Sequence, residues 1–281
     1  ICKTNNLKEC IECLPNILAG KYFKDLINAI TSAHRNEKPI IWAMGAHVIK
    51  CGLSPLIINL MKKGFVNAIA LNGAGVIHDV EIALIGATSE DVTKGLLTGR
   101  FGMAKETAEI INTAIKEGVE RGYGLGRAVG EKLIRINAPF NNYSILANAI
   151  DLKIPVTCHV AIGTDVIHMH PNADGAAIGQ ASLIDFKILT SIMRNLNGGV
   201  FLNIGSAVIL PEVFLKALAI LRNLGYDIAN FTSAVFDFKL HYRPLQNIVN
   251  RPKALGAKSY YFIGHHELLI PLLAAALIDA K

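Results

Sequence analysis

The chain has 281 residues and a formal net charge of +6; 52% of its residues are hydrophobic and 18% are charged. Such a composition can build a large core and excludes a mainly disordered chain. The basic residues form no block interleaved with aromatic residues, which excludes the usual nucleic-acid-binding pattern. No apolar run reaches the roughly 18 residues of a membrane span, and no signal-type leader is visible. We therefore expect a cytoplasmic protein with no membrane or nucleic-acid partner.

The cysteines form no even disulfide framework, which indicates a reducing compartment. They are Cys2, Cys10, Cys13, Cys51 and Cys158. Cys10 and Cys13 form a CxxC pair. We interpret this pair either as a metal or redox motif, or as two small residues on an amphipathic N-terminal helix.

The first part of the chain predicts helix, strand, helix and strand in turn. Residues 1–36 form a helical lead-in, because the apolar residues of 21–36 recur with helical spacing. Residues 39–44 are apolar on both faces, which is typical of a strand covered by helices on both sides. The apolar positions of 56–61 predict a helix, and the apolar run 66–71 predicts a second strand.

The middle of the chain is predicted to be mainly helical. Residues 88–91 are a helix-start signal, and helices are predicted over 103–121, 127–137 and 144–151. The glycine-rich segment 122–126 superficially resembles a phosphate-binding loop. It follows a helix rather than a strand, so a helix stop and connector is the alternative.

A second series of strands and helices begins at residue 154. The predicted strands are 154–162, 199–204, 228–234 and 259–263, and the predicted helices are 181–196, 212–224 and 266–279. The segment 237–256 is predicted to be irregular. In it Asp237, Lys239, His241 and Arg243 alternate, either as a solvated edge or as a lid over a ligand site. The alternation of strands and helices predicts an α/β fold, a Rossmann-like parallel sheet with helices on both faces, in a single domain over residues 1–281.

Small and polar residues follow five of the predicted strands. In an open parallel sheet, ligands sit outside the carboxyl ends of the strands, and small residues let the backbone approach them closely. We therefore predict a nucleotide-sized ligand at this edge. The predicted cofactor-binding residues are Gly45, Ala46, Asn72, Gly73, Ala74, Gly75, Glu81, Gly163, Thr164, Gly205, Ser206, Thr232, Ser233 and Ala234.

Histidines and aspartates in the same segments are candidates for acid–base catalysis or substrate contact, since histidine titrates near neutrality. The predicted catalytic residues are His47, His78, Asp79, His159, Asp165, His168 and His170. Two alternatives stay open for His168 and His170: a divalent-metal site with Asp174, or ordinary loop structure. The acidic residues after the second strand equally suit a helix start. His265 and His266 are predicted to be structural, with a site role as the alternative.

The first block of these motifs resembles the deoxyhypusine synthase family. The matching segments are Met44–Gly52 and Asn72–Glu81. In that family, a small turn with Ser-Asn and a Thr-Ala-Gly-Gly-like turn with acidic residues occupy these places. Three further segments are similar to its Thr-Asp-Gly-Ser, glycine-rich and Asn-Thr-Ala segments. These are 163–165, 205–212 and 232–234, and the resemblance covers most of 39–240 in order.

The resemblance implies a Rossmann-like domain that binds NAD, in a homo-oligomer, usually a tetramer with sites at subunit interfaces. It also implies spermidine oxidation and aminobutyl transfer to a protein lysine. The family's nucleophilic lysine lies in a Trp-Gly-Lys segment, but the sole tryptophan here is Trp42. Residues 236–241 replace the acidic segment before that lysine, and Glu212 and Val213 replace a lysine and a histidine. A covalent imine therefore has no obvious acceptor.

We therefore expect a deoxyhypusine-synthase-like, NAD-dependent transferase or oxidoreductase that acts on a small molecule, with amines among the candidates. We do not expect deoxyhypusine synthesis itself. One alternative is a metal- or histidine-dependent enzyme on the same scaffold without NAD. Another is a nucleotide-binding protein without catalysis.

Overall fold

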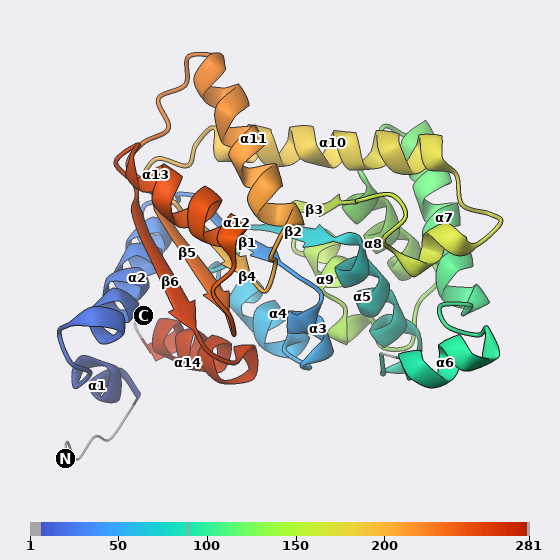
Figure 1. Ribbon diagram of the computed structural model, residues 1–281, viewed down its shortest axis with the longest axis horizontal. Helices are drawn as coiled ribbons and strands as arrows, with labels where there is room; N and C mark the ends of the chain where they lie inside the picture. The colour runs from blue at the N-terminus through green and yellow to red at the C-terminus, as the bar shows by residue number, and fades with distance from the viewer. Residues whose placement is uncertain (1–6, 89, 280–281) are drawn as a thin grey trace. The chain divides into compact units, whose positions relative to one another are not determined.

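The computed structural model describes residues 7–88 and 90–279 (Figure 1). Within these residues, six strands form one sheet with the order β3-β2-β1-β4-β5-β6. The strands are β1 Ile40–Met44, β2 Ala68–Asn72, β3 Val156–His159, β4 Val200–Ile204, β5 Thr232–Asp237 and β6 Lys258–Ile263. The pairs β2–β3, β4–β5 and β5–β6 run parallel. The predicted α/β class with a parallel sheet is confirmed.

The helices fall close to the predicted ranges. They are α1 Leu7–Glu12, α2 Leu18–Arg35, α3 His47–Lys50, α4 Ser54–Lys62, α5 Gly73–Ile85, α6 Val92–Thr98, α7 Lys105–Glu120, α8 Leu125–Arg135, α9 Ile145–Asp151, α10 Gly175–Met193, α11 Ile209–Asn223, α12 Tyr242–Pro244, α13 Arg251–Lys253 and α14 His266–Asp279. Short helical turns are η1 Asn141–Tyr143 and η2 Val166–Met169, and η3 Leu245–Asn250 is a π-helix. Among the described residues, α10 is long and apolar enough to cross a membrane by length and composition alone, a test that core helices also pass.

The chain divides into two compact units by its internal contacts. Unit 1 comprises Ile1–Ala43, Asn59–Ala68 and Thr190–Lys281, and unit 2 comprises Met44–Ile58 and Ile69–Leu189. Strands β4, β5 and β6 belong to unit 1, and β3 belongs to unit 2.

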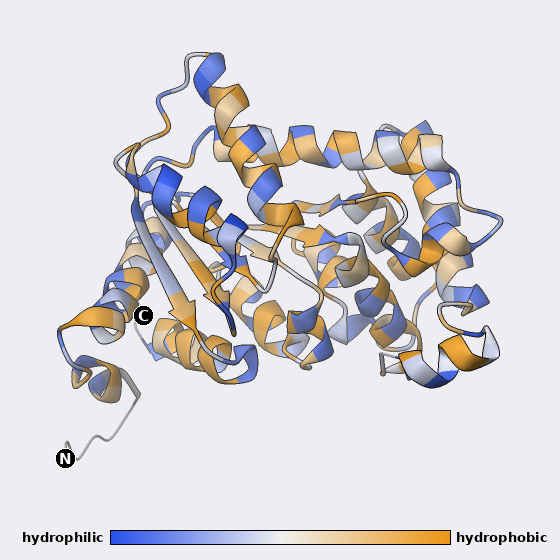
Figure 2. Ribbon diagram, viewed as in Figure 1, coloured by the Kyte–Doolittle hydropathy of each residue, from blue (hydrophilic) through white to orange (hydrophobic). Residues whose placement is uncertain are grey.

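In unit 1, helices cover both faces of strands β4 to β6. On one face, Phe262 of β6 stacks with Phe236 of β5 and packs edge-on against Phe23 of α2. On the other face, the Ser233 hydroxyl lies 2.5 Å from the Ile248 carbonyl oxygen in η3. Strand β6 begins with polar residues and becomes apolar toward its end (Figure 2). Successive side chains of a strand point to opposite faces of the sheet, so these strands contribute to a core layer on each face.

In unit 2, a buried carboxylate ties three elements together. Asp185 lies in the middle of α10 and is fully buried. Its Oδ2 atom accepts hydrogen bonds from the backbone nitrogens of Gly126 at 2.9 Å and Cys158 at 2.7 Å. A Cβ at Gly124 would lie 1.8 Å from the Asp185 Oδ1 atom, so the start of α8 must be glycine for this carboxylate to approach. Burial raises the pKa of Asp185 to about 7, and the backbone hydrogen bonds offset part of that rise.

Two expectations about unit 1 are wrong. Thr232, Ser233 and Ala234 do not form a turn after a strand; they are the buried first half of β5, which continues to Asp237. Small polar residues fit inside this strand because Ser233 donates its hydrogen bond to η3. The segment 237–256 is largely helical rather than irregular: α12, η3 and α13 follow one another without a gap from residue 242 to residue 253, and Pro252 lies in α13.

Candidate functional site

The site begins where β2 passes directly into α5. Asn72 ends the strand, and its side chain accepts a hydrogen bond from the Gly75 backbone nitrogen at 3.0 Å. Gly73, Ala74 and Gly75 are therefore the first turn of a helix rather than an open loop. Strand β3 runs alongside, with Asn72 opposite His159. The carboxyl ends of β2 and β3 thus lie next to each other, as the sequence predicts.

The segment after β3 folds back over the start of α5. A Cβ on Gly73 would lie 1.9 Å from the Asp165 Oδ2 atom, so the carboxylate rests against the helix N-terminus and requires glycine there. Asp165 caps η2, and the His168 Nδ1 atom accepts from the Asp165 backbone nitrogen in return. Asp165 is 8% exposed, and its Oδ2 atom has no hydrogen-bond partner among the described residues. Burial raises the pKa of Asp165, and nearby His168 lowers it in part.

Three side chains form a hydrogen-bonded cluster on and after α5. The Nδ1 atom of His78 lies 2.8 Å from the Glu81 Oε2 atom and 2.5 Å from the Thr88 hydroxyl. The Thr88 hydroxyl donates to the same Glu81 oxygen. All three residues are half-buried. A hydrogen on Nδ1 that points to the carboxylate leaves Nε2 of His78 as the nitrogen that can accept a proton.

His78, Glu81 and Asp165 line one cavity of about 210 Å³ within unit 2. Its lining residues are Lys50, Ala74, Ile77, His78, Glu81, Glu90, Val92, Phe101, Thr164, Asp165 and Val166. Three carboxylates face one lysine and one histidine, and apolar side chains supply the rest of the wall. Such a lining suits a small molecule that carries a cationic group on a short apolar frame.

Five predicted site residues line this cavity. They are Ala74, His78, Glu81, Thr164 and Asp165. Asn72, Gly73 and Gly75 shape the helix start beside it, and Gly163 donates its backbone N–H to His168 Nδ1 at 3.1 Å. The prediction that the segments after β2 and β3 meet is therefore confirmed within unit 2.

Asp79 does not line the cavity. It is fully buried, and its carboxylate accepts hydrogen bonds from the Ser144 hydroxyl at 2.5 Å and from the Ile145 and Leu146 backbone nitrogens at 2.7 and 3.1 Å. Its burial raises the pKa of Asp79 to about 6, and these hydrogen bonds offset part of the rise. The expected contact of Asp79 with a ligand does not fit this geometry, because the carboxylate caps α9 instead.

His159 is also buried rather than open to a ligand. It is 3% exposed, and its Nε2 atom lies 3.0 Å from the Thr157 hydroxyl, which itself donates to the Ile69 carbonyl oxygen. Burial lowers the pKa of His159 to about 4. The ring is therefore neutral near pH 7 and serves as a polar core residue at the end of β3.

The alternative metal site has no common centre. His168 Nδ1 accepts backbone hydrogen bonds, His170 Nε2 lies 2.9 Å from the Gly102 carbonyl oxygen, and Asp174 accepts from the Ala176 and Ala177 backbone nitrogens at the start of α10. Within residues 7–88 and 90–279, these three side chains form no group close enough to hold a metal ion. Instead, each of them bonds to backbone groups of its own neighbourhood.

The predicted site residues after β1 and β4 are not in the lining of the unit 2 cavity. Gly45 is buried, Ala46 precedes α3, and His47 is exposed on α3. In unit 1, Gly205 has φ 66°, and a Cβ there would lie 2.6 Å from the His266 ring. The Ser206 hydroxyl accepts from the Leu210 backbone nitrogen at 3.2 Å, which starts α11.

Two larger hollows, of about 660 and 860 Å³, lie in unit 1 around α2. The larger one is lined by Thr232 and Lys258, the first residues of β5 and β6, and therefore lies at the amino ends of these strands. Thr232 is the one predicted site residue in either lining. The larger hollow lies at the edge where a parallel sheet is not expected to bind its ligand, and the smaller one is lined by helical residues and the residue after α2.

Sequence reasoning missed the charged cavity residues Lys50 and Glu90, and Thr88, which bonds to His78 and Glu81. Lys50 lies inside the first segment that resembles deoxyhypusine synthase, which is a usable signal. Thr88 and Glu90 belong to a predicted helix start, and nothing in their spacing shows that this loop returns to His78 and Glu81.

No family model matches the chain, and no curated protein matches it either. Solved structures do match it. AgrE without ligand is 15% identical with a TM-score of 0.60, over 100% of this chain and 34% of its own. A LOR/SDH-type protein from Methanococcus maripaludis S2 is 16% identical with a TM-score of 0.54, over 100% and 72%. A candidate deoxyhypusine synthase from Entamoeba histolytica is 12% identical with a TM-score of 0.57, over 99% and 94%.

These likenesses concern the fold. The chain spans about a third of the length of AgrE, whereas it spans nearly all of the Entamoeba protein. AgrE has been solved in a ternary complex with ornithine and NAD+, and a mutant of it with L-arginine. The chain therefore has a Rossmann-like fold similar to that of deoxyhypusine-synthase-like proteins.

Proposed function

We propose that the protein is an enzyme that binds NAD and acts on a small amine-bearing molecule, whose ammonium group is held in the unit 2 cavity. The charge of this cavity carries the proposal. Glu81, Glu90 and Asp165 supply three carboxylates against the single ammonium of Lys50. Asp165 Oδ2 in particular is buried and has no donor among the described residues, so a bound ammonium would satisfy it. The likeness to AgrE, which binds ornithine and NAD+, supports this class of ligand.

The residues fit NAD in part. The cavity, at about 210 Å³, is smaller than the roughly 300–1,000 Å³ of pockets that enclose drug-sized ligands, so it does not hold a whole dinucleotide. Asp165 lies against the N-terminus of α5, so a pyrophosphate at that helix end would meet a carboxylate. Glu81 and Thr164 are the residues that would hold ribose hydroxyls. NAD bound beside this cavity would supply the hydride acceptor.

The chain's own residues would then bind the amine and move its proton. Asp165 and Glu90 orient the ammonium group by charge-assisted hydrogen bonds. Glu81 holds His78 by its Nδ1 atom, so that Nε2 accepts the proton that leaves the amine on oxidation. Lys50 suits the carboxylate of an amino-acid substrate, because it is the single lysine in the lining.

A second candidate is an enzyme on the same scaffold that uses the His78–Glu81 pair without a nucleotide. The small volume of the cavity favours it. A thermal-shift screen separates the two, because a ligand that binds only the folded state raises its melting temperature. The screen uses NAD, NADP, ornithine and spermidine, alone and in pairs. The first candidate predicts stabilisation by NAD and a further shift with an amine; stabilisation by an amine alone supports the second.

We further propose that the protein is a cytoplasmic homo-oligomer, since the resemblance to deoxyhypusine synthase implies a tetramer. Light scattering of the purified chain measures its mass in solution. A mass of 30.3 kDa would contradict the oligomer, because that is the mass of one chain.

A further inference from the structure

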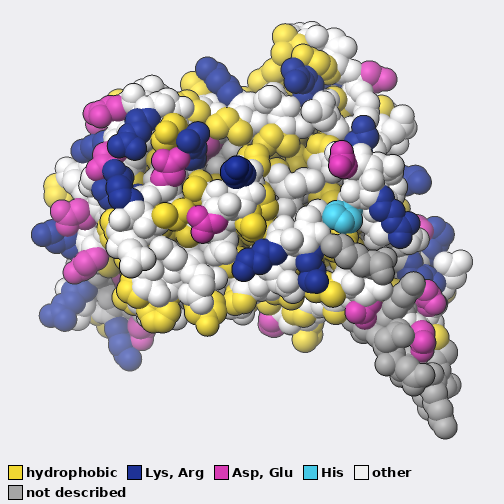
Figure 3. All heavy atoms as spheres, turned by 180° about the vertical axis from the view of Figure 1, so that it is seen from behind, with side chains coloured by type: hydrophobic (Ala, Val, Ile, Leu, Met, Phe, Trp, Pro, Cys, Tyr) yellow, Lys and Arg dark blue, Asp and Glu magenta, His cyan; other side chains and the backbone are white. Residues whose placement is uncertain are grey.

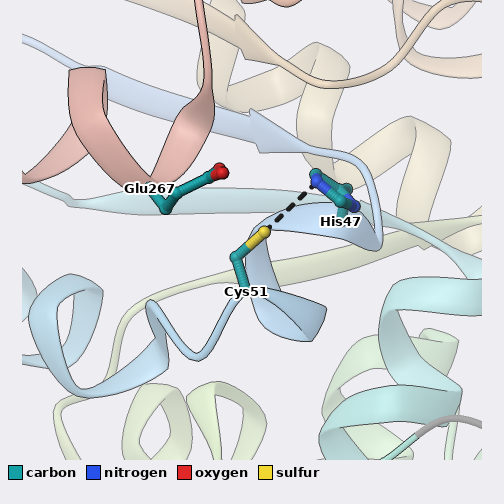
Figure 4. Close-up of side chains that lie close together, drawn as sticks. All are labelled: His47, Cys51 and Glu267. Carbon is teal, nitrogen blue, oxygen red and sulfur yellow. Dashed lines mark hydrogen bonds between the residues drawn. The ribbon is translucent and has the colours of Figure 1, made fainter.

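His47 and Cys51 lie one helical turn apart in unit 2, on α3 and at its C-terminal end (Figure 4). The Nε2 atom of His47 lies 3.2 Å from the Cys51 sulfur. His47 is exposed and Cys51 is half-buried, so small reagents can reach the pair from solution. This pair is outside the lining of the cavity, and the function proposed above does not use it.

The backbone at Cys51 does not favour a thiolate. Cys51 follows the last residue of α3, and its backbone nitrogen already donates to the His47 carbonyl oxygen at 2.9 Å. Carbonyl dipoles at a helix C-terminus disfavour negative charge, although α3 is so short that this effect is small. The imidazole that touches the Cys51 sulfur can favour a thiolate, because its Nε2 atom lies within reach of the thiol proton. An adjacent histidine is what makes cysteines nucleophilic in other proteins.

We propose that Cys51 is a reactive thiol that exchanges with small-molecule disulfides, with His47 as its general base. His47 Nε2 takes the thiol proton, and the Cys51 sulfur attacks one sulfur of the disulfide. A mixed disulfide on Cys51 forms as the original disulfide bond breaks. The other sulfur leaves as a thiolate, which takes the proton from His47. One disulfide bond replaces another, so the small disulfide is the sole oxidant.

The buried cysteine of the same unit shows the contrast. Cys158 is fully buried in β3, and burial raises the pKa of its thiol well above its usual range. Such a thiol is inert toward reagents in water. A chain in which Cys2, Cys10 and Cys13 are serine therefore reports on Cys51 while the protein is folded.

The test is the rate at which this triple-serine chain reacts, at pH 7, with an aromatic disulfide that releases a coloured thiolate. We expect Cys51 to react about tenfold faster in the folded chain than in the same chain unfolded in urea. His47→Gln should lower the folded rate about tenfold, and the rate should then level off only at higher pH. Cys51→Ser should abolish the fast reaction.

Lys50→Gln is the matched control, because it removes a neighbouring positive charge without touching the sulfur's hydrogen bond. We expect it to change the rate less than about threefold. In urea, all variants that keep Cys51 should react at the same rate. A difference seen only in the folded chain is then due to the contact between His47 and the Cys51 sulfur. An unchanged rate in His47→Gln, or an equal loss in Lys50→Gln, would overturn the proposal.

Discussion

At the scale of single residues, the contact between Asp165 and Gly73 defines the cavity wall. The Asp165 carboxylate occupies the space that any side chain at residue 73 would need. Its Oδ2 atom is held there without a hydrogen-bond donor among the described residues. A glycine thus lets a buried carboxylate reach the start of α5, where partial positive charge stabilises it.

Gly73→Ala should displace Asp165, because the new Cβ would lie 1.9 Å from its Oδ2 atom. We expect a loss of about 1–3 kcal/mol in the free energy of unfolding, as in other overpacked cores. Gly179→Ala on α10 is the matched control. Nothing lies within 4 Å of a Cβ there, so this change should stabilise the helix by up to about 1 kcal/mol. Urea unfolding measures both; equal effects would contradict the assigned contact.

Sequence patterns predict the position of a site residue best where that residue directly follows a strand. Asn72, Gly73 and Gly75 follow a buried apolar strand, and a strand end next to small residues is visible in one dimension. The burial of Asp79 and His159 is not visible there, because it depends on α9 and on the Thr157 side chain. Asp185 is visible in the sequence as the one carboxylate of the mainly apolar segment 181–189.

At the scale of elements, helix α9 begins at a buried cap. The Ser144 hydroxyl accepts from the Ala147 backbone nitrogen at 3.0 Å and lies 2.5 Å from Asp79 Oδ2. By contrast, α6 begins at the exposed cap Asp91, which accepts from the Lys94 backbone nitrogen at 3.1 Å. A side-chain cap is therefore buried at α9 and exposed at α6.

Ser144→Ala should cost more stability than Asp91→Ala. Loss of the buried cap also leaves Asp79 without one of its donors, so we expect about 2 kcal/mol or more for Ser144→Ala. We expect about 0.5–1 kcal/mol for the exposed cap. Chemical denaturation of the two variants gives the comparison. A larger loss in Asp91→Ala would show that the hydrogen bonds of Asp79 contribute little.

Most helices and strands follow from sequence periodicity, and the failures have particular causes. The residues 232–234 are small and polar, which imitates a turn, but Ser233 satisfies its hydroxyl inside the core. Residues 237–256 contain Pro244 and Pro252. Proline disfavours a helix interior, but both prolines lie within the helical run of α12, η3 and α13.

At the scale of the whole molecule, charges of both signs are interspersed on the face seen in Figure 3. The pH dependence of stability should therefore come from buried groups. Burial raises the pKa of Asp79 to about 6 and that of Asp185 to about 7, while unfolded aspartate titrates near ~3.9. Between these values the folded chain binds more protons than the unfolded chain. Its free energy of unfolding therefore falls as pH rises through this window.

His159 acts in the opposite direction. Burial lowers the pKa of His159 to about 4, so the unfolded chain binds more protons than the folded one below ~6.5, and acid destabilises through this group. The two aspartates outweigh one histidine. We expect the net contribution of these three groups to stabilise the protein on acidification from about pH 7.5 to 5.5. Urea unfolding at both pH values measures it. Asp185→Asn should reduce the gain, and an unchanged gain would contradict the assignment.

The expectation of one domain over residues 1–281 is also a statement about the whole molecule. We predict a single unfolding transition, with the same midpoint by circular dichroism and by the fluorescence of Trp42. Trp42 is buried in β1. Two separate midpoints would show that units 1 and 2 unfold independently.

The central claim is that the carboxylates of the unit 2 cavity bind an amine. Calorimetric titration of ornithine, with NAD present, tests it most directly on the wild-type chain, Glu90→Gln and Glu120→Gln. Glu90 lines the cavity, and Glu120 is an exposed carboxylate at the end of α7. We predict that Glu90→Gln weakens ornithine binding about tenfold or more, since it removes a charge that the ammonium meets, and that Glu120→Gln changes it less than twofold. Ornithine binding that is absent from the wild-type chain, or equal in all three proteins, would contradict the claim.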